Sequence, residues 1–336
     1  MLQFWHPVML SRDLPRRNAT GVRVAGRSLA LFRSGPDRVG ALDVVCPHRR
    51  MRLSLGTVQN GRLTCPYHGW SFDCDGNGES PGTPKLHTCT EHYDCRDAHG
   101  VIWVKASGPE RPLPDVSHPG FVPIKPIVNE VRVPLQLLID NFSEIEHTGI
   151  RHPAFGLDPA RMEEAVVSYE QTDDAVTVTN VGPAKPPPFC TRRILRFRRR
   201  FLFHSDYTFR FDPPRVAIEH YWTDPAKGGR EGMIKYRVHV FFVPVDEQNS
   251  RVVTFAAAHS RWRFLPRGGV PLMAWHLRKG VAQTMVEDVW ILENLADQTP
   301  EMDGMKLSRF DRILGMTREK LQRIYLGRAE EPVATE

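Results

Sequence analysis

Cys46-Pro47-His48 and Cys65-Pro66-Tyr67-His68 are the two stretches that decide the organisation of this chain of 336 residues. Each stretch places one thiol and one imidazole within a few residues of each other, and 16 residues lie between His48 and Cys65. Thiolate sulfur and imidazole nitrogen are atoms that proteins use to bind zinc and iron. The two stretches together therefore predict one metal centre with four protein ligands.

Two kinds of centre fit these four ligands. In a Rieske-type [2Fe-2S] cluster, Cys46 and Cys65 would bind one iron, and His48 and His68 would bind the other. A structural zinc ion also accepts two Cys and two His, but the usual zinc-finger order pairs Cys with Cys and His with His. The order in this chain is mixed, which favours the cluster over zinc.

The residues around the second stretch narrow the assignment. Cys65-Pro-Tyr-His-Gly-Trp-Ser-Phe-Asp73, with Gly76 shortly after it, resembles the second ligand loop of the Rieske oxygenases, which are ring-hydroxylating oxygenases and related demethylases. Gly69 would allow the backbone to approach the inorganic sulfides closely. Trp70 and Phe72 would shield one side of the cluster and help to set its potential.

Length and composition agree with a two-domain globular protein. The chain is 41% hydrophobic and 25% charged, as in ordinary soluble proteins. No apolar run approaches the ~20 residues that span a bilayer, and the N-terminus lacks the pattern of a signal peptide. We expect a cytoplasmic protein that binds neither membrane nor nucleic acid, and its net charge of +6 suits an acidic electron-transfer partner. In a reducing compartment, the remaining cysteines are expected to be packing thiols: Cys74, Cys89, Cys95 and Cys190.

The distribution of prolines predicts the domain boundaries. Short β-type runs broken by Gly and Pro occupy residues 22–104 and predict an all-β sandwich that carries the ligand loops at one end. Six prolines between Ser107 and Pro126 predict an extended connector. We therefore expect an N-terminal Rieske domain at residues 1–107, a Pro-rich linker at 108–126 and a second domain at 127–336.

The second domain is predicted to be α+β. Leu135, Leu138, Ile139 and Phe142 recur at helical spacing, so residues 130–148 are predicted to be a helix that ends at Gly149 and Pro153. The later predicted elements are strands at 165–181, 192–211, 215–223, 233–245 and 251–263, and helices at 276–299 and 308–326. This order predicts a curved antiparallel sheet that wraps a cavity against a long helix, and it is similar to the helix-grip (START-like) catalytic domain that follows the Rieske domain in this family.

A second group of candidate ligands lies in this domain. His147 and His152 are five residues apart, about 140° around a helix, so both can face one point only if the helix ends between them. Asp288 lies within a mainly apolar stripe of the long predicted helix, and a buried carboxylate needs a positive partner. That partner is either a metal ion or an arginine. Its neighbour Glu287 shares a face with Gln283 and Asn294 and is expected to stay in water.

The resemblance gives these residues roles. Asn141-Phe-Ser-Glu-Ile-Glu-His147, His152 and the later Glu-Asp-Val-Trp resemble the mononuclear iron site of the same family, which implies that His147, His152 and Asp288 form its facial triad for Fe(II). Glu144 occupies a position where many members carry Asp. The resemblance implies that Glu144 bridges His147 to His68 of an adjacent chain, while the alternative is a solvated helix carboxylate.

These assignments predict an enzyme. The leading hypothesis is the oxygenase component of a Rieske non-haem iron monooxygenase, which uses O2 to hydroxylate or oxidatively demethylate a small, cyclic organic molecule. The alternatives are an aromatic-ring cis-dihydroxylating dioxygenase and a Rieske electron-transfer protein without catalysis. Electrons are expected from a separate NAD(P)H-dependent reductase, a ferredoxin or both, and the resemblance implies a homotrimer. In the predicted strand at 192–211, Arg199 could pair with a substrate carboxylate or with a structural acid.

Overall fold

The computed structural model describes residues 1–153, 155–187, 197–260 and 269–328. Its contacts divide the chain into two compact units, Met1–Asp115 with Val243–Val253, and Val116–Phe242 with Thr254–Glu336. The division at Asp115 falls within the Pro-rich stretch that the sequence suggests as a connector. The segment Val243–Val253 makes its contacts mainly with the first unit. The predicted domains are consecutive ranges of the sequence and therefore do not include this exchange.

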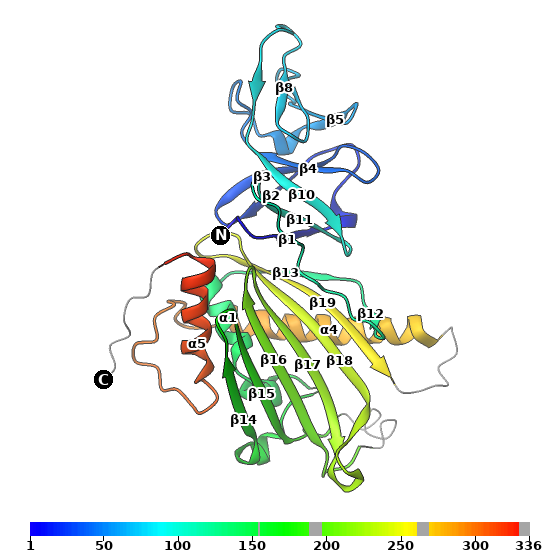
Figure 1. Ribbon diagram of the computed structural model, residues 1–336, viewed down its shortest axis with the longest axis vertical. Coiled ribbons are helices and arrows are strands. Elements are labelled where there is room, and N and C mark those ends of the chain that lie inside the picture. Colours follow the sequence, from blue (N-terminus) through cyan, green and yellow to red (C-terminus); the bar gives the residue numbers. More distant parts are fainter. Residues whose placement is uncertain (154, 188–196, 261–268, 329–336) are drawn as a thin grey trace. The chain divides into compact units, whose positions relative to one another are not determined.

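The first unit contains two antiparallel sheets (Figure 1). The six-stranded sheet has the spatial order β1 (His6–Leu10), β11 (Val101–Ala106), β10 (His92–Ala98), β4 (Val39–Asp43), β3 (Arg27–Arg33) and β2 (Thr20–Val24). The five-stranded sheet consists of β5 (Thr57–Gln59), β6 (Arg62–Thr64), β7 (Ser71–Phe72), β8 (Asn77–Glu79) and β9 (Thr88–Cys89). Two short 3-10 helices are η1 (Ser11–Asp13) and η2 (Leu53–Leu55).

Two-residue hairpin turns connect several of these strands. Ala25-Gly26, Asn60-Gly61 and His99-Gly100 join β2 to β3, β5 to β6 and β10 to β11, and all six residues have positive φ. A two-residue type I′ turn needs positive φ at both positions, and its twist matches that of the flanking strands. The two sheets enclose an apolar cluster that includes Cys46 and Cys65, so the cysteine of each predicted ligand loop belongs to the core.

The second unit is one curved sheet that packs against a long helix (Figure 1). The spatial order of the sheet is β12 (Val122–Pro123), β19 (Ser250–Ser260), β18 (Arg230–Pro244), β17 (Pro214–Asp224), β16 (Leu202–Phe211), β15 (Ala175–Pro183) and β14 (Val166–Gln171), and β13 (Ile127–Val131) also pairs with β19. The helices are α1 (Leu135–Ser143), α2 (Glu146–Arg151), α4 (Gly269–Glu293) and α5 (Ile313–Lys320). Shorter helical segments are η3 (Pro159–Glu164), η4 (Pro225–Lys227) and η5 (Leu321–Tyr325).

The sheet has one buried face, as its sequence pattern requires. Alternate residues of β16 are buried, from Phe203 to Phe211, and the same alternation runs through the first half of β17. Because successive side chains of a strand point to opposite faces, these residues line one concave surface, and α4 runs across it (Figure 1). The predicted α+β class with a curved antiparallel sheet is therefore confirmed.

Three predicted elements differ from the observed ones. The helix expected at 130–148 is two helices, because β13 precedes it and Glu144 has extended backbone (φ −112°, ψ 156°) between α1 and α2. The strand expected at 165–181 is the hairpin of β14 and β15. Of the strand expected at 192–211, residues 192–196 lie outside the described residues. Residues 197–201 are not part of a strand, because the backbone N–H of Phe201 closes a turn onto Arg198 O, and β16 begins at Leu202.

That turn removes the basis for a substrate role of Arg199, whose side chain is exposed and does not line the cavity described below. The prediction that unpaired cysteines are packing thiols is wrong for Cys89, which is exposed, while Cys190 lies outside the described residues. None of the described helices combines the length and the apolar composition that crossing a lipid bilayer requires.

Candidate metal centres

The two predicted cluster loops are built alike. In the first loop the backbone N–H groups of Cys46 and Arg50 pair with Met51 O and Cys46 O; in the second, those of Cys65 and Gly69 pair with Trp70 O and Cys65 O. The residue four after each cysteine has positive φ, 55° at Arg50 and 71° at Gly69. Each loop is thus a tight turn that returns the chain directly after its histidine.

The four candidate ligands are two buried sulfurs and two more accessible imidazoles whose rings lie close together. The cysteines are buried, with exposed fractions of 1% for Cys46 and 3% for Cys65, whereas His48 is exposed. The rings of His48 and His68 lie 4.5 Å apart between centroids, and Trp70 stacks on His48 at 4.5 Å. Burial raises the pKa of the Cys46 thiol, while the backbone N–H groups of His48 and Arg49 counteract that rise. Two buried sulfurs, one of which receives backbone N–H donors, beside two more accessible imidazoles fit the ligand arrangement of a Rieske cluster.

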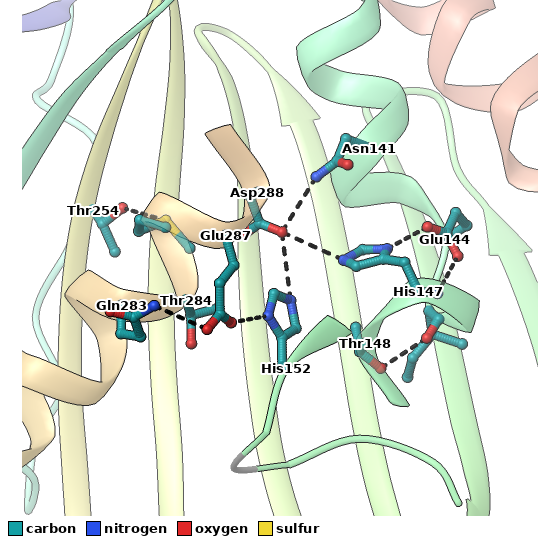
Figure 2. Close-up of polar contacts among 12 residues, drawn as sticks. Asn141, Glu144, His147, Thr148, His152, Thr254, Gln283, Thr284, Glu287 and Asp288 are labelled. Atoms are coloured by element: carbon teal, nitrogen blue, oxygen red, sulfur yellow. Dashed lines mark hydrogen bonds and ion pairs between the residues drawn. The ribbon is translucent and has the colours of Figure 1, made fainter. Parts of the chain in front are cut away.

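The second candidate site joins residues that are distant in the chain. His147 belongs to α2, His152 directly follows that helix, and Asp288 lies on α4. The Nε2 atoms of both histidines lie 3.4 Å from the same atom, Asp288 Oδ1. One ligand atom from each of the three residues lies within 4.8 Å of the others, a spacing that could hold a metal ion. Figure 2 shows the two imidazoles converging on Asp288.

Each imidazole uses its second ring nitrogen to contact a glutamate. His147 Nδ1 contacts Glu144 Oε1, and the backbone N–H of His147 donates to Glu144 Oε2 over 3.1 Å. His152 Nδ1 lies 2.9 Å from Glu287 Oε2. A carboxylate at Nδ1 keeps the proton there, so Nε2 is left as the metal-binding nitrogen and becomes more basic.

Carboxylates outnumber the positive groups in this site. Asp288 and Glu287 are 4% and 9% exposed, and the Nδ2 of Asn141 is 3.5 Å from Asp288 Oδ1 (Figure 2). Burial acts to lower the pKa of His147, but hydrogen bonds with Asp288 and Glu144 outweigh it and raise that pKa to about 10. The surroundings therefore favour positive charge at this point, and a divalent cation would supply it.

A cavity of about 290 Å³ adjoins the three ligands. Strand residues of the concave face and residues of α4 line it, among them Tyr207, His220, Trp222 and Tyr236. The ring of Phe155 stacks on His152 with centroids 5.1 Å apart and forms part of the same lining. A small, largely apolar molecule can therefore lie next to the candidate metal site.

Glu287 has a role that the sequence did not indicate, and the prediction that its side chain is solvated is wrong. Glu287 shares a face of the helix with Gln283, whose Nε2 donates to Glu287 Oε1 over 3.0 Å. The face that these residues share is covered because the segment around His152 packs against it. A useful signal was available: a ligating histidine needs an acceptor for its other ring nitrogen.

Two parts of the chain match the sequence patterns of known protein families. Residues 4–93 match the Rieske [2Fe-2S] domain, and residues 131–324 match the vanillate O-demethylase oxygenase C-terminal domain. Protein TIC 55 of Pisum sativum chloroplasts is 29% identical over 182 residues, 50% of this chain and 33% of that protein. The chain thus spans about a third of the length of such chloroplast relatives.

Two further comparisons extend over most of the chain. The 4beta-methylsterol monooxygenase of Methylococcus capsulatus is 26% identical over 330 residues, 86% of this chain and 79% of that protein. The crystal structure of dicamba monooxygenase bound to 3,6-dichlorosalicylic acid has the same fold, with a TM-score of 0.79, 20% identity and 97% of both chains covered. With a Rieske domain at residues 4–93 and an oxygenase domain of the vanillate O-demethylase type over more than half of its length, the chain belongs to the Rieske oxygenase family.

Proposed function

We propose that this protein is the oxygenase component of a Rieske non-haem iron monooxygenase that hydroxylates or oxidatively demethylates a small, cyclic organic molecule. The observation that carries the proposal is the convergence of His147 Nε2 and His152 Nε2 on Asp288 Oδ1 at the wall of a cavity. A protein that only carried electrons would need neither this group nor the adjoining cavity. The description of the matching C-terminal domain as that of a demethylase supports the same branch of the family.

The second site is assigned to mononuclear Fe(II), with His147, His152 and Asp288 as its ligands. When bound, an iron ion with two imidazoles and one carboxylate supplies open positions at which dioxygen is activated. Glu144 and Glu287 hold the two imidazoles in the tautomer that leaves Nε2 free. The apolar cavity wall excludes water from the reacting substrate.

The first site is assigned to the [2Fe-2S] cluster, with Cys46 and Cys65 on one iron and His48 and His68 on the other. Because His48 is exposed and His68 is half-exposed, electrons would enter and leave at the histidine side of the cluster. A separate NAD(P)H-dependent reductase, a ferredoxin or both would supply them, as the sequence predicts.

We also propose that copies of the chain assemble head to tail into a ring, a homotrimer, in which Glu144 contacts His68 of the next copy. Exposed apolar side chains near both sites support this, because such side chains are usually covered in an assembly. Val45 and Tyr67, 45% and 56% exposed, lie beside the cluster loops, whereas Ile150 and Trp290, 70% and 54% exposed, lie on α2 and α4. Assembly in the reducing cytoplasm is part of the same proposal.

Replacement of the carboxylate ligand tests the function. The Asp288→Ala variant should lose the mononuclear iron and all product formation, while the visible spectrum of the cluster stays. Glu293→Ala is the matched control on the same helix, because Glu293 pairs with Arg132, whose side chain is 80% exposed. The assay uses a panel of methoxyarenes, including vanillate, with a surrogate reductase and labelled dioxygen.

The label also separates the reaction classes. One labelled oxygen in the product or in the released formaldehyde means monooxygenation, whereas two labelled oxygens in a ring diol mean dihydroxylation. Turnover that persists in Asp288→Ala refutes the mononuclear assignment. Colourless wild-type protein that contains zinc and no acid-labile sulfide refutes the cluster.

A further inference from the structure

The cavity beside the candidate iron site contains a polar side chain that the proposed ligands do not use. His220 lies on β17 and lines the cavity. The ring of Phe155 contacts both His220 and the candidate metal ligand His152: its centroid is 5.1 Å from that of His152 and 5.2 Å from that of His220. His220 and the candidate metal ligand thus share one aromatic neighbour.

The position of His220 is fixed by the sheet. It is the register partner of Ser205 on β16, and its Nδ1 lies 2.9 Å from Ser205 Oγ. The ring of Phe203 packs against the His220 ring with centroids 5.3 Å apart, and His220 is only 9% exposed. A side chain held by a neighbouring strand, a hydroxyl and two aromatic rings has one orientation, which suits it to position a ligand.

Hydrogen bonding around Ser205 determines which nitrogen of His220 carries the proton. Ser205 is fully buried, and a side-chain partner of its hydroxyl is His220 Nδ1. A buried hydroxyl donates its proton to the acceptor within range, so Ser205 Oγ–H donates to His220 Nδ1. The proton of the neutral imidazole consequently lies on Nε2. Burial keeps the imidazole neutral, because it lowers the pKa of His220 to about 3.

The Nε2–H group has no acceptor among the described residues, and His220 lines the cavity. The charged side chains that the described part of the chain contributes to the lining are both acidic, Glu144 and Asp288. The described lining residues include no lysine or arginine that could pair with an anionic substrate group. An uncharged oxygen, in contrast, can accept the Nε2–H hydrogen bond.

We propose that His220 is a specificity-determining residue whose Nε2–H binds a carbonyl or hydroxyl oxygen of an uncharged ring substrate. The opposite end of that ring then lies towards His147, His152 and Asp288. The substrate class is a planar, neutral molecule with an oxygen acceptor at one end and the oxidised carbon at the other. This inference rests on the proposed function for its meaning, but it can be tested by binding alone.

Three probes of nearly equal size separate the possibilities. They are 4-methoxyacetophenone, which has a carbonyl opposite its methoxy group; 4-isopropylanisole, which replaces that carbonyl by a methyl branch; and 4-methoxybenzoate, which is anionic. Dissociation constants are measured by anaerobic titration calorimetry on the full-length, metal-loaded protein without reductant. Because no turnover occurs, a failure of the oxygenase assignment cannot alter the result.

The variants isolate the Nε2–H group. In the wild-type protein we expect the ketone to bind about tenfold more tightly than 4-isopropylanisole, and the benzoate to bind least tightly. His220→Phe should abolish the preference for the ketone, and His220→Gln, which keeps an N–H donor, should restore part of it. His204→Phe is the matched control, because His204 precedes Ser205 on β16, does not line the cavity, and places its Nε2 2.8 Å from Thr223 Oγ1 instead.

Three outcomes would overturn the proposal. They are a ketone preference that survives in His220→Phe, a wild-type protein that does not bind the ketone, and a benzoate that binds more tightly than the ketone. Loss of the preference in His204→Phe would likewise show that the cavity-facing histidine is not its cause.

Discussion

Nδ1 of His152 lies 2.9 Å from Oε2 of Glu287, although the two residues are 135 positions apart in the chain. The contact joins the end of α2 to α4, the two elements that supply the candidate iron ligands. It also matches the contact between His147 and Glu144 on the other side of the site. Both imidazoles are therefore oriented by glutamates, one local in sequence and one distant.

Removing the distant glutamate should weaken metal binding. In Glu287→Ala, His152 loses the acceptor that fixes its tautomer and orientation, so we expect Fe(II) affinity to fall by about 10–100-fold. Titration with Co(II), followed by its absorption spectrum, measures the change. Glu293→Ala, on the same helix, should bind as the wild-type protein does, and unchanged affinity in Glu287→Ala would show that Glu287 does not support the ligand.

The glycine between the two histidines has a packing role that differs from the predicted one. Helix α2 continues past Gly149 to Arg151 rather than ending there. A Cβ atom at Gly149 would lie 2.1 Å from Leu157 O, a backbone atom. Gly149→Ala should therefore displace α2, lower the free energy of unfolding by about 1–3 kcal/mol and reduce iron content.

A helical glycine without such a neighbour is the control for this variant. Nothing lies within 4 Å of a Cβ built at Gly315 in α5, so Gly315→Ala should be neutral or stabilise by up to about 1 kcal/mol. Urea denaturation and iron analysis measure both variants. Equal effects at the two positions would contradict the packing role of Gly149.

A buried ion pair joins α1 to α5. The Nη2 and Nε atoms of Arg318 lie 2.5 Å and 3.3 Å from the two carboxylate oxygens of Asp140, and the side chains are 16% and 13% exposed. Arg318→Leu leaves a buried carboxylate without its charged partner, so the free energy of unfolding, measured by urea denaturation, should fall by about 3–5 kcal/mol. The double variant Asp140→Leu/Arg318→Leu should recover part of this loss. Arg132→Leu removes an exposed ion pair and is the control. The prediction is refuted if Arg318→Leu lowers the free energy of unfolding by no more than Arg132→Leu does.

Acid should destabilise the first unit through His6. Burial lowers the pKa of this fully buried histidine from 6.5 to about 3, so it stays neutral in the folded state. In the unfolded chain this histidine has its ordinary pKa of about 6.5 and binds a proton below that pH. The free energy of unfolding is therefore unaffected by His6 above that pH and falls by about 1.4 kcal/mol per pH unit as pH decreases from about 6.5 towards 3.

Amide hydrogen exchange of β11, the strand that pairs with β1, measures this loss locally. Between pH 6.5 and 4.5, protection of β11 should fall further in the wild-type protein than in His6→Gln, whose side chain does not titrate. Identical pH dependence in the two proteins would assign the acid sensitivity of this region to other groups.

Local spacing in the sequence is sufficient to identify the candidate ligands of the cluster. Cys46, His48, Cys65 and His68 are read from local spacing, because each pair lies on one short turn and needs no distant contact to be recognised. Amphipathic and alternating patterns were sufficient for the α+β class and for most strands of the second unit.

Tertiary structure alone decided which side chains meet. The patterns that gave the long helix could not place Glu287, because its burial depends on the chain segment that packs on that face of α4. The same holds for Arg199, which a turn takes out of β16, and for His220, whose neighbours come from another strand and from the segment after α2. The periodicity of a sequence shows which face of its own helix or strand a side chain occupies. A site depends in addition on which side chains of other elements lie at the same point in space.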